Sequence, residues 1–131
     1  MDAKTGIIKR VPLFEGSSRR ELRRIAALAD EIDVPAGTTL TAEGATGREF
    51  VVLVEGVADV TRNGEVVNTV GPGEFVGEIS LVTGERRTAT VTTRSPAKLL
   101  LLNAQAFRSL VEGMPDMKRR IAATAALRLA G

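Results

Sequence analysis

The chain has 131 residues, the size of one ordinary domain, so an enzyme built from two lobes around a cleft is not expected. Hydrophobic residues make up 44% and charged residues 26%, values typical of a folded globular protein and not of a disordered or fibrous one. The net charge of +2 is too small to indicate a nucleic-acid-binding protein on its own.

The residue types that are missing exclude further functions. With no Cys and no His, the chain lacks thiol nucleophiles, disulfides, imidazole acid–base groups and the ligands of almost every zinc or iron site. Four Phe without Trp or Tyr offer a poor stacking surface for single-stranded nucleic acid. No apolar run is long enough for a membrane span, and the first residues lack the apolar core of a signal peptide. Metal sites built from carboxylates alone stay open at this point, but no metal ligand is assigned. We expect a cytoplasmic, non-enzymatic protein without membrane insertion or nucleic acid.

The first part of the chain, residues 1–29, has a helical pattern with a break at residues 11–14. Ser18 followed by Glu21 has the spacing of a capping box and predicts a helix start. The basic run at residues 19–24 lies beside apolar residues at helical spacing, so we interpret it as the solvated face of this helix.

Residues 30–103 form a β-rich middle of short β-branched runs separated by glycines. The pair Asn63-Gly64 lies between two such runs and favours the positive φ angles of a type I′ hairpin turn, so antiparallel pairing is expected. Gly44, Gly47 and Gly56 are interpreted as turn or bulge glycines that shape the sheet, without ligand contact.

Helical patterns return in residues 104–131, with a break at residues 113–115. Met117, Ile121, Ala125 and Leu129 mark one apolar face of the last helix. This face fits simple packing on the β-rich part, and it equally fits a lid that closes over a ligand. The fold class is therefore α+β: a small antiparallel β-roll or jelly-roll barrel flanked by N-terminal and C-terminal helices in a single domain, residues 1–131.

The segment at residues 73–91 combines features that suit a phosphate. One helical turn beginning at Gly77 directs backbone N–H groups to a single point, and small Ser80 leaves that point open. Arg87, ten residues after Gly77, can supply the cation. Glu78 would repel a phosphate unless a hydroxyl group between them donates to it, which a ribose 2′-OH can do. A ligand whose phosphate folds against its own ribose satisfies both requirements.

Residues 75–81 and 87–91 resemble the phosphate-binding cassette of cyclic nucleotide-binding domains. This cassette lies within residues 75–91, and residues 37–56 resemble an earlier glycine-bearing strand pattern of the same family. Together the two motifs cover about half of the chain and are in the order that the family has. The resemblance implies a regulatory domain that binds cAMP, with cGMP as the other ligand to consider, and that needs no cofactor.

The resemblance also implies roles for individual residues. Arg87 would pair with the cyclic phosphate, and Glu78 would accept a hydrogen bond from the ribose 2′-OH. The other ligand-binding residues expected from the motif are Gly77, Ile79, Ser80, Thr88 and Ala89.

The sequence departs from the family at three places. Arg86 stands where proline is common, Thr41 replaces an apolar residue, and an aromatic residue to cap the base is missing near the C-terminus. Thr88 leaves cGMP open as the ligand, because in this family a Thr directly after the cassette Arg can form a hydrogen bond with the amino group of guanine.

The output of such a domain is not encoded in an obvious motif. The chain has no room after the sensor for a helix-turn-helix, so binding DNA unaided is not expected. An effector protein or domain and a second copy of the chain remain open as partners. The competing interpretation is a degenerate domain of the same fold that serves as a protein-interaction module without nucleotide.

Overall fold

The structure is a computed structural model, and it describes residues 2–130. The helices flank the strands on both sides in the chain; they are α1 (Ala3–Lys9), the 3-10 turn η1 (Pro12–Phe14), α2 (Arg19–Leu28), α3 (Glu78–Thr83), α4 (Ala104–Gly113) and α5 (Pro115–Ala130). The strands are β1 (Asp30–Val34), β2 (Thr39–Thr41), β3 (Glu49–Glu55), β4 (Ala58–Arg62), β5 (Glu65–Val70), β6 (Phe75–Val76), β7 (Thr90–Thr93) and β8 (Ala97–Asn103).

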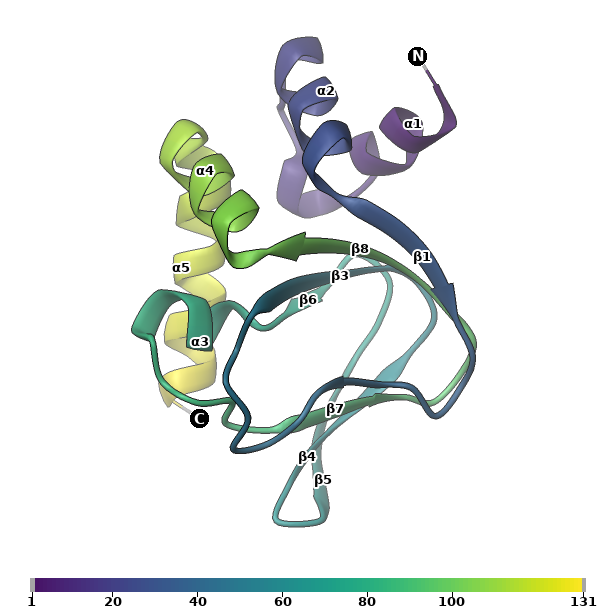
Figure 1. Cartoon of the computed structure of the whole chain (residues 1–131), viewed down its shortest axis with the longest axis vertical. Coiled ribbons are helices and arrows are strands. Elements are labelled where there is room, and N and C mark those ends of the chain that lie inside the picture. The colour runs from purple at the N-terminus through teal and green to yellow at the C-terminus, as the bar shows by residue number, and fades with distance from the viewer. Residues whose placement is uncertain (1, 131) are drawn as a thin grey trace.

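The strands form two four-stranded antiparallel sheets. The order is β1-β8-β3-β6 in the first sheet and β2-β7-β4-β5 in the second. The two sheets face each other and the chain passes between them at the ends, which gives an open roll and not a closed barrel (Figure 1). The expected α+β fold with an antiparallel β-roll is confirmed.

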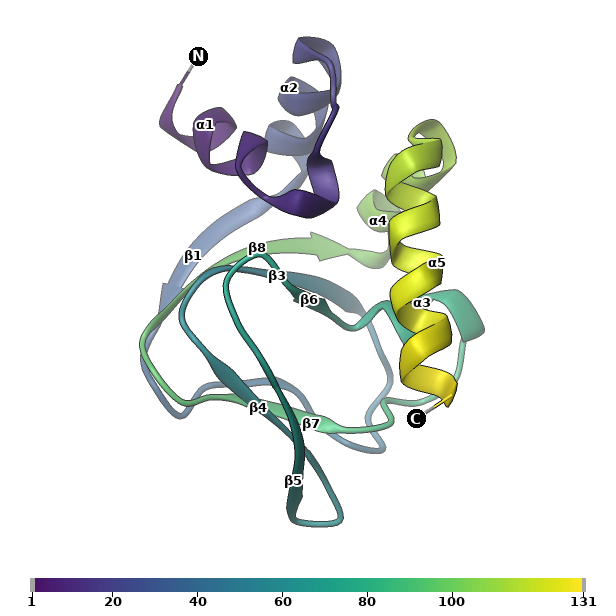
Figure 2. The same cartoon turned by 180° about the vertical axis from the view of Figure 1, so that it is seen from behind.

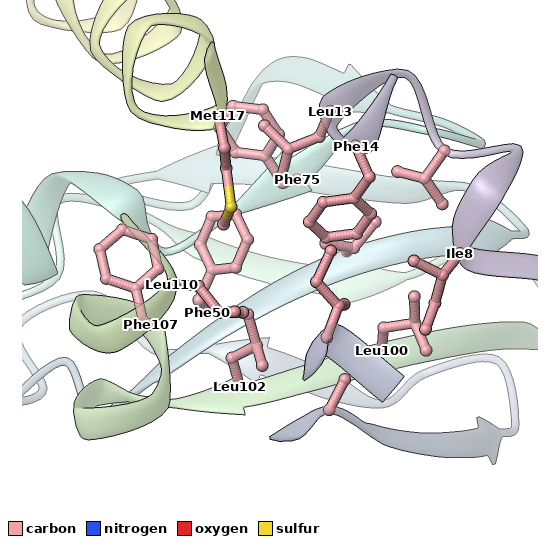
Figure 3. Packing of buried hydrophobic residues seen from close by; sticks show 14 of the residues in the cluster. Ile8, Leu13, Phe14, Phe50, Phe75, Leu100, Leu102, Phe107, Leu110 and Met117 are labelled. Atoms are coloured by element: carbon pink, nitrogen blue, oxygen red, sulfur yellow. The ribbon is translucent and has the colours of Figure 1, made fainter. Parts of the chain in front are cut away.

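Strand β3 has a buried side chain on both of its faces. Phe50 and Val52 point to a core shared with the helices, whereas Val51 and Leu53 point to a second core inside the roll. Because successive side chains of a strand alternate between its faces, one strand contributes to both cores. In the core on the helix side, the Phe50 ring lies 4.8 Å from that of Phe107 (Figure 3).

Two local signals predicted from the sequence are confirmed. Ser18 caps α2: its side chain accepts from the Glu21 amide, and the Glu21 carboxylate accepts from the Ser18 amide in return. Asn63 has φ 52° and lies at the turn between β4 and β5, where Arg62 pairs with Glu65.

The helices gather on the outer side of the first sheet, with α1 and α2 over one end and α4 and α5 over the other (Figure 1). Seen from behind, α5 runs from this layer down along the side of the roll to α3 (Figure 2). The last turns of α5 therefore reach the part of the roll that holds the predicted cassette. Within residues 2–130, every helix is too short or too polar to cross a membrane.

The predicted apolar face of α5 is correct for three of its four residues. Met117, Ile121 and Ala125 are buried against the rest of the protein. Leu129 was predicted to share this face, but its side chain is 60% exposed, because the helix extends past the helix-side core before residue 129 is reached. Packing therefore anchors the first three turns of α5, and other contacts hold its end.

Replacing Met117 tests this anchoring. Met117→Ala removes a fully buried side chain and should lower the free energy of unfolding by about 2–5 kcal/mol. Leu129→Ala is the matched control and should change it by less than about 0.5 kcal/mol, because the side chain is exposed. Urea denaturation followed by circular dichroism measures both. Equal losses would contradict the assignment of Leu129 to the surface.

Candidate ligand-binding site

A pocket of about 370 Å³ opens between α3, the second sheet and the end of α5. All seven ligand-binding residues predicted from the sequence line it: Gly77, Glu78, Ile79, Ser80, Arg87, Thr88 and Ala89. The remaining wall comes from β2, β4, β5, β6, β7 and α5, and its larger apolar side chains are Val60, Val67, Val70, Val76, Val91 and Leu127. The structure thus brings the two halves of the cassette to one cavity.

Gly77 is the N-cap of helix α3 and has a backbone conformation that favours glycine. Gly77 has φ 98°, and a Cβ at this position would lie 2.6 Å from the Glu49 carbonyl oxygen and 2.8 Å from Nη1 of Arg87. No side chain caps the helix, so its first amides are left for another partner. The sequence-based expectation of one short helix starting at Gly77 is confirmed.

Arg87 is held in place before any ligand arrives. Its Nη1 donates to the Gly77 carbonyl at 2.8 Å and its Nη2 to the Glu49 carbonyl at 2.6 Å. Its backbone amide donates to the Ala45 carbonyl, and the residue as a whole is 8% exposed. Burial lowers the pKa of Arg87, which the nearby Glu78 and Glu49 carboxylates oppose, and the guanidinium stays charged. A fixed cation therefore faces the pocket.

Glu78 is the most buried charged residue of the site, with 1% of its surface exposed. Both carboxylate oxygens accept from Nη1 of Arg128, one of them at 2.8 Å. Burial raises the pKa of Glu78, and the charge and hydrogen bonds of Arg128 oppose this shift. The side chain thus pairs with a residue of α5 fifty positions away.

Arg128 is a site residue that sequence reasoning did not find. Its Nη2 also donates to the Phe75 carbonyl at 2.7 Å, and its guanidinium lies 5.5 Å from the centre of the Phe75 ring. From its sequence the last helix fits packing on the roll and a lid equally well, and neither interpretation names Arg128. A single Arg on a helix belongs to no motif, so the sequence does not distinguish an Arg in a buried ion pair from one that is exposed to solvent.

Gly47 was interpreted as a turn glycine without ligand contact, and the structure gives it a different position. A Cβ on Gly47 would lie 2.4 Å from the Ser80 Cβ and 3.0 Å from the Arg87 guanidinium carbon. The residue therefore lets the loop before β3 pack directly against α3 and Arg87. Gly44 and Gly56 have positive φ angles, in agreement with their interpretation as turn residues.

The two departures within the motifs have structural explanations. Thr41 is buried on the pocket wall, and its hydroxyl donates to the Ala89 carbonyl at 3.1 Å, so this polar side chain is satisfied. Arg86 is exposed and donates to the Gly44 carbonyl at 3.0 Å, which joins the cassette to the loop after β2 in place of a proline.

Residues 2–130 contain no group of three or more acidic, His or Cys side chains that could hold a metal. The charged side chains on the pocket wall are three arginines, Arg62, Arg87 and Arg128, and one carboxylate, Glu78.

Comparison with known proteins gives the same assignment as this geometry. A family model for the cyclic nucleotide-binding domain matches residues 31–113, which is more than half of the chain. The chain belongs to the cyclic nucleotide-binding domain family. The predicted resemblance is thereby confirmed.

Similar curated proteins have different overall activities. The chain is 32% identical over 115 residues to a cAMP-dependent protein kinase regulatory subunit of Aspergillus niger, covering 86% of this chain and 28% of that protein. It is 35% identical over 116 residues to a Pycsar effector protein of Xanthomonas perforans, covering 87% and 38%. It is 32% identical over 125 residues to a cyclic nucleotide-gated potassium channel of Rhizobium etli, covering 95% and 35%. The chain thus spans between a quarter and two fifths of these relatives.

Solved structures share the fold. A cAMP-bound PfPKA-R fragment superposes with a TM-score of 0.83 at 21% identity, covering 96% of this chain and 45% of that one. The regulatory domain of Toxoplasma gondii protein kinase A with cAMP gives a TM-score of 0.71 at 29% identity, covering 82% and 42%. The regulatory subunit of a cAMP-independent protein kinase A from Trypanosoma brucei gives 0.83 at 18%, covering 92% and 44%. The same fold therefore occurs in two cAMP-bound proteins and in the regulatory subunit of a cAMP-independent kinase.

The close approach at Gly47 can be tested by adding one methyl group. Gly47→Ala should lower the free energy of unfolding by about 1–3 kcal/mol, because the added Cβ overlaps Ser80. Gly6→Ala is the matched control: this helical position has no atom within 4 Å of the added Cβ, so stability should stay equal or rise by up to about 1 kcal/mol. Chemical denaturation compares the two, and an unaffected Gly47→Ala variant would contradict the packing.

The Glu78–Arg128 pair predicts a dependence of stability on pH. The pKa of Glu78 is raised in the folded protein, so the folded state holds more protons than the unfolded state above pH 4.5, and stability should fall as pH rises through the folded pKa. In Arg128→Gln the larger of the two opposing charges is gone while Arg87 remains, so the pKa of Glu78 rises further, and the fall in stability should be larger and extend to higher pH. Denaturation at a series of pH values measures it. A smaller fall than in the wild type would contradict the pairing.

Proposed function

We propose that this chain is a cyclic-nucleotide sensor domain that binds cAMP, with cGMP as the alternative ligand. The observation that carries the proposal is the presence of Arg87 and Glu78, both buried, on the wall of one pocket that α3 helps to form. A cation and a carboxylate on one wall suit a ligand that has an anionic group next to a hydroxyl group. A cyclic nucleotide has both, because its phosphate is cyclised onto its own ribose. The names of several relatives include cAMP, which makes it the first ligand to test.

The charges and the space support this ligand class. Three arginines, Arg62, Arg87 and Arg128, and one carboxylate, Glu78, line a pocket of about 370 Å³, so the cavity favours an anion. We assign the phosphate to Arg87 and the ribose 2′-OH to Glu78. Gly77, Ile79, Ser80, Thr88 and Ala89 complete the contacts around them.

The proposed role is regulatory and not catalytic. The relatives are regulatory subunits, channels and an effector protein, and binding in this pocket needs no bond to be made or broken. The unit that we propose to bind and respond is the single domain of residues 1–131, of which residues 1 and 131 lie outside the described residues. It consists of the roll at residues 30–103 with helical residues 1–29 and 104–131 around it. An effector protein or domain would receive the signal, and a homodimer is a further arrangement to test.

Helix α5 is the element that we propose to respond to the ligand. Leu127 and Arg128 line the pocket together with the cassette, so a bound nucleotide would contact α5 directly. Glu78 has acceptor positions for both Arg128 and a ribose hydroxyl. A ligand that interacts better with the docked helix than with an undocked one shifts the population toward the docked arrangement.

A binding experiment tests the site. Arg87→Ala should lose about 2–5 kcal/mol of binding free energy for cAMP and for cGMP, because it removes the buried counter-charge of the phosphate. Arg48→Ala is the matched control, since Arg48 is exposed and lies outside the pocket, and its affinity should be unchanged. Isothermal titration calorimetry on nucleotide-free protein measures both. If folded wild-type protein binds neither nucleotide, the proposal of a sensor is rejected and an interaction module is favoured. The regulatory subunit of a cAMP-independent kinase has the same fold, which is compatible with that alternative.

The response of α5 can be measured with spin labels, because the chain has no Cys of its own. Val82→Cys on α3 and Leu129→Cys on α5 place labels at exposed positions, 61% and 60% accessible. The distance distribution between them should narrow when cAMP is added. Adding Arg128→Ala should weaken cAMP binding and broaden the distribution, and the Arg87→Ala background is the non-binding control. Broadening on addition of cAMP would mean that ribose and Arg128 compete, which contradicts the proposed direction.

A further inference from the structure

Arg62 is the arginine of the pocket that the assignments above leave without a role. It ends β4, is half-buried, and lines the pocket. Among the described residues, its Nε is the buried side-chain nitrogen or oxygen atom that lacks a hydrogen-bond partner. A buried N–H group without a partner costs free energy, so such an atom on the wall of a binding pocket points to a partner that comes with the ligand.

The position of Arg62 indicates which part of the ligand it would meet. If the phosphate lies at Arg87 and the ribose at Glu78, the third part of a nucleotide, its base, has to lie along the rest of the wall. That part of the wall comes largely from β4 and β5, where Val60 pairs with Asn68 and Arg62 pairs with Glu65 across the hairpin. Val60 and Val67 supply apolar contacts for the flat faces of the base, and Arg62 and Asn68 are the polar side chains beside them.

These polar side chains present hydrogen-bond donors. The guanidinium of Arg62 has donors only. The Oδ1 of Asn68 already accepts from the Thr69 amide at 2.8 Å, which leaves the amide nitrogen of Asn68 to face a ligand. A wall of donors is complementary to a base edge that consists of acceptors.

The two purines differ at this edge. Guanine presents two acceptors, O6 and N7, and an Arg fork bonds both of them, whereas adenine presents the acceptor N7 beside the N6 amino donor. We propose that Arg62 is a specificity-determining residue that binds the O6/N7 edge of the base and gives the pocket its affinity for cGMP. This inference rests on the proposed function, and it assigns base recognition to β4, outside the cassette.

Substitutions at Arg62 separate this role from a general effect of charge. Arg62→Met keeps the length of the side chain without donors, and Arg62→Lys keeps the charge without the planar fork. Calorimetric titration of each variant of the 131-residue chain with cAMP, cGMP and cyclic inosine monophosphate tests the assignment. Cyclic inosine monophosphate has O6 and N7 but lacks the 2-amino group of guanine, so it isolates this edge from any contact of Thr88 with that amino group.

In Arg62→Met, we expect the affinity for cGMP and for cyclic inosine monophosphate to fall about tenfold relative to the affinity for cAMP, and in Arg62→Lys, whose ammonium group can still donate to O6 and N7, we expect a smaller fall. Arg48→Met, at an exposed position outside the pocket, should leave all three affinities unchanged. If Arg62→Met weakens the binding of all three nucleotides equally and Arg62→Lys restores it, Arg62 acts on the phosphate by its charge. This result would overturn the proposal. Unchanged ratios in both variants would overturn it as well. These results differ from failure of the proposed function, in which folded wild-type protein binds none of the nucleotides and both proposals fall.

Discussion

The arrangement of the site depends on one buried guanidinium. Arg87 donates to the carbonyls of Gly77 and Glu49, which belong to the start of α3 and to β3, and its own amide bonds the loop after β2. Three segments that are far apart in the chain are therefore joined at one cation. Because these bonds leave the guanidinium little freedom, a ligand phosphate does not have to order it, and less conformational entropy is lost on binding.

The sequence predicted the parts of this arrangement that depend on local pattern. The capping box at Ser18, the turn at Asn63 and the short helix after Gly77 are each determined by a few neighbouring residues, and the structure has all three. It also places the seven cassette residues around one pocket, because a ten-residue spacing between Gly77 and Arg87 allows a helix and a return.

The contacts that the sequence did not predict join residues far apart in the chain. Arg128 reaches Glu78 because α4 and η1 pack against α5 and fix its direction, and no local sequence pattern predicts that direction. The sequence around Gly47 is typical of a turn. The close packing of this residue is explained only by Ser80, which is far away in the chain and lies next to it in the fold. The buried face of α5 was predicted to extend to Leu129, which is exposed. Helical periodicity shows which residues share a face, but it does not show where the core under that face ends.

The two faces of β3 have a consequence for how the protein unfolds. Phe50 and Val52 belong to the core under the helices, and Val51 and Leu53 belong to the core inside the roll. Removal of the helix layer would uncover one face of a strand whose other face holds the roll together. The two cores therefore cannot be lost one after the other without a costly half-exposed sheet between them, and the domain should melt in a single cooperative transition.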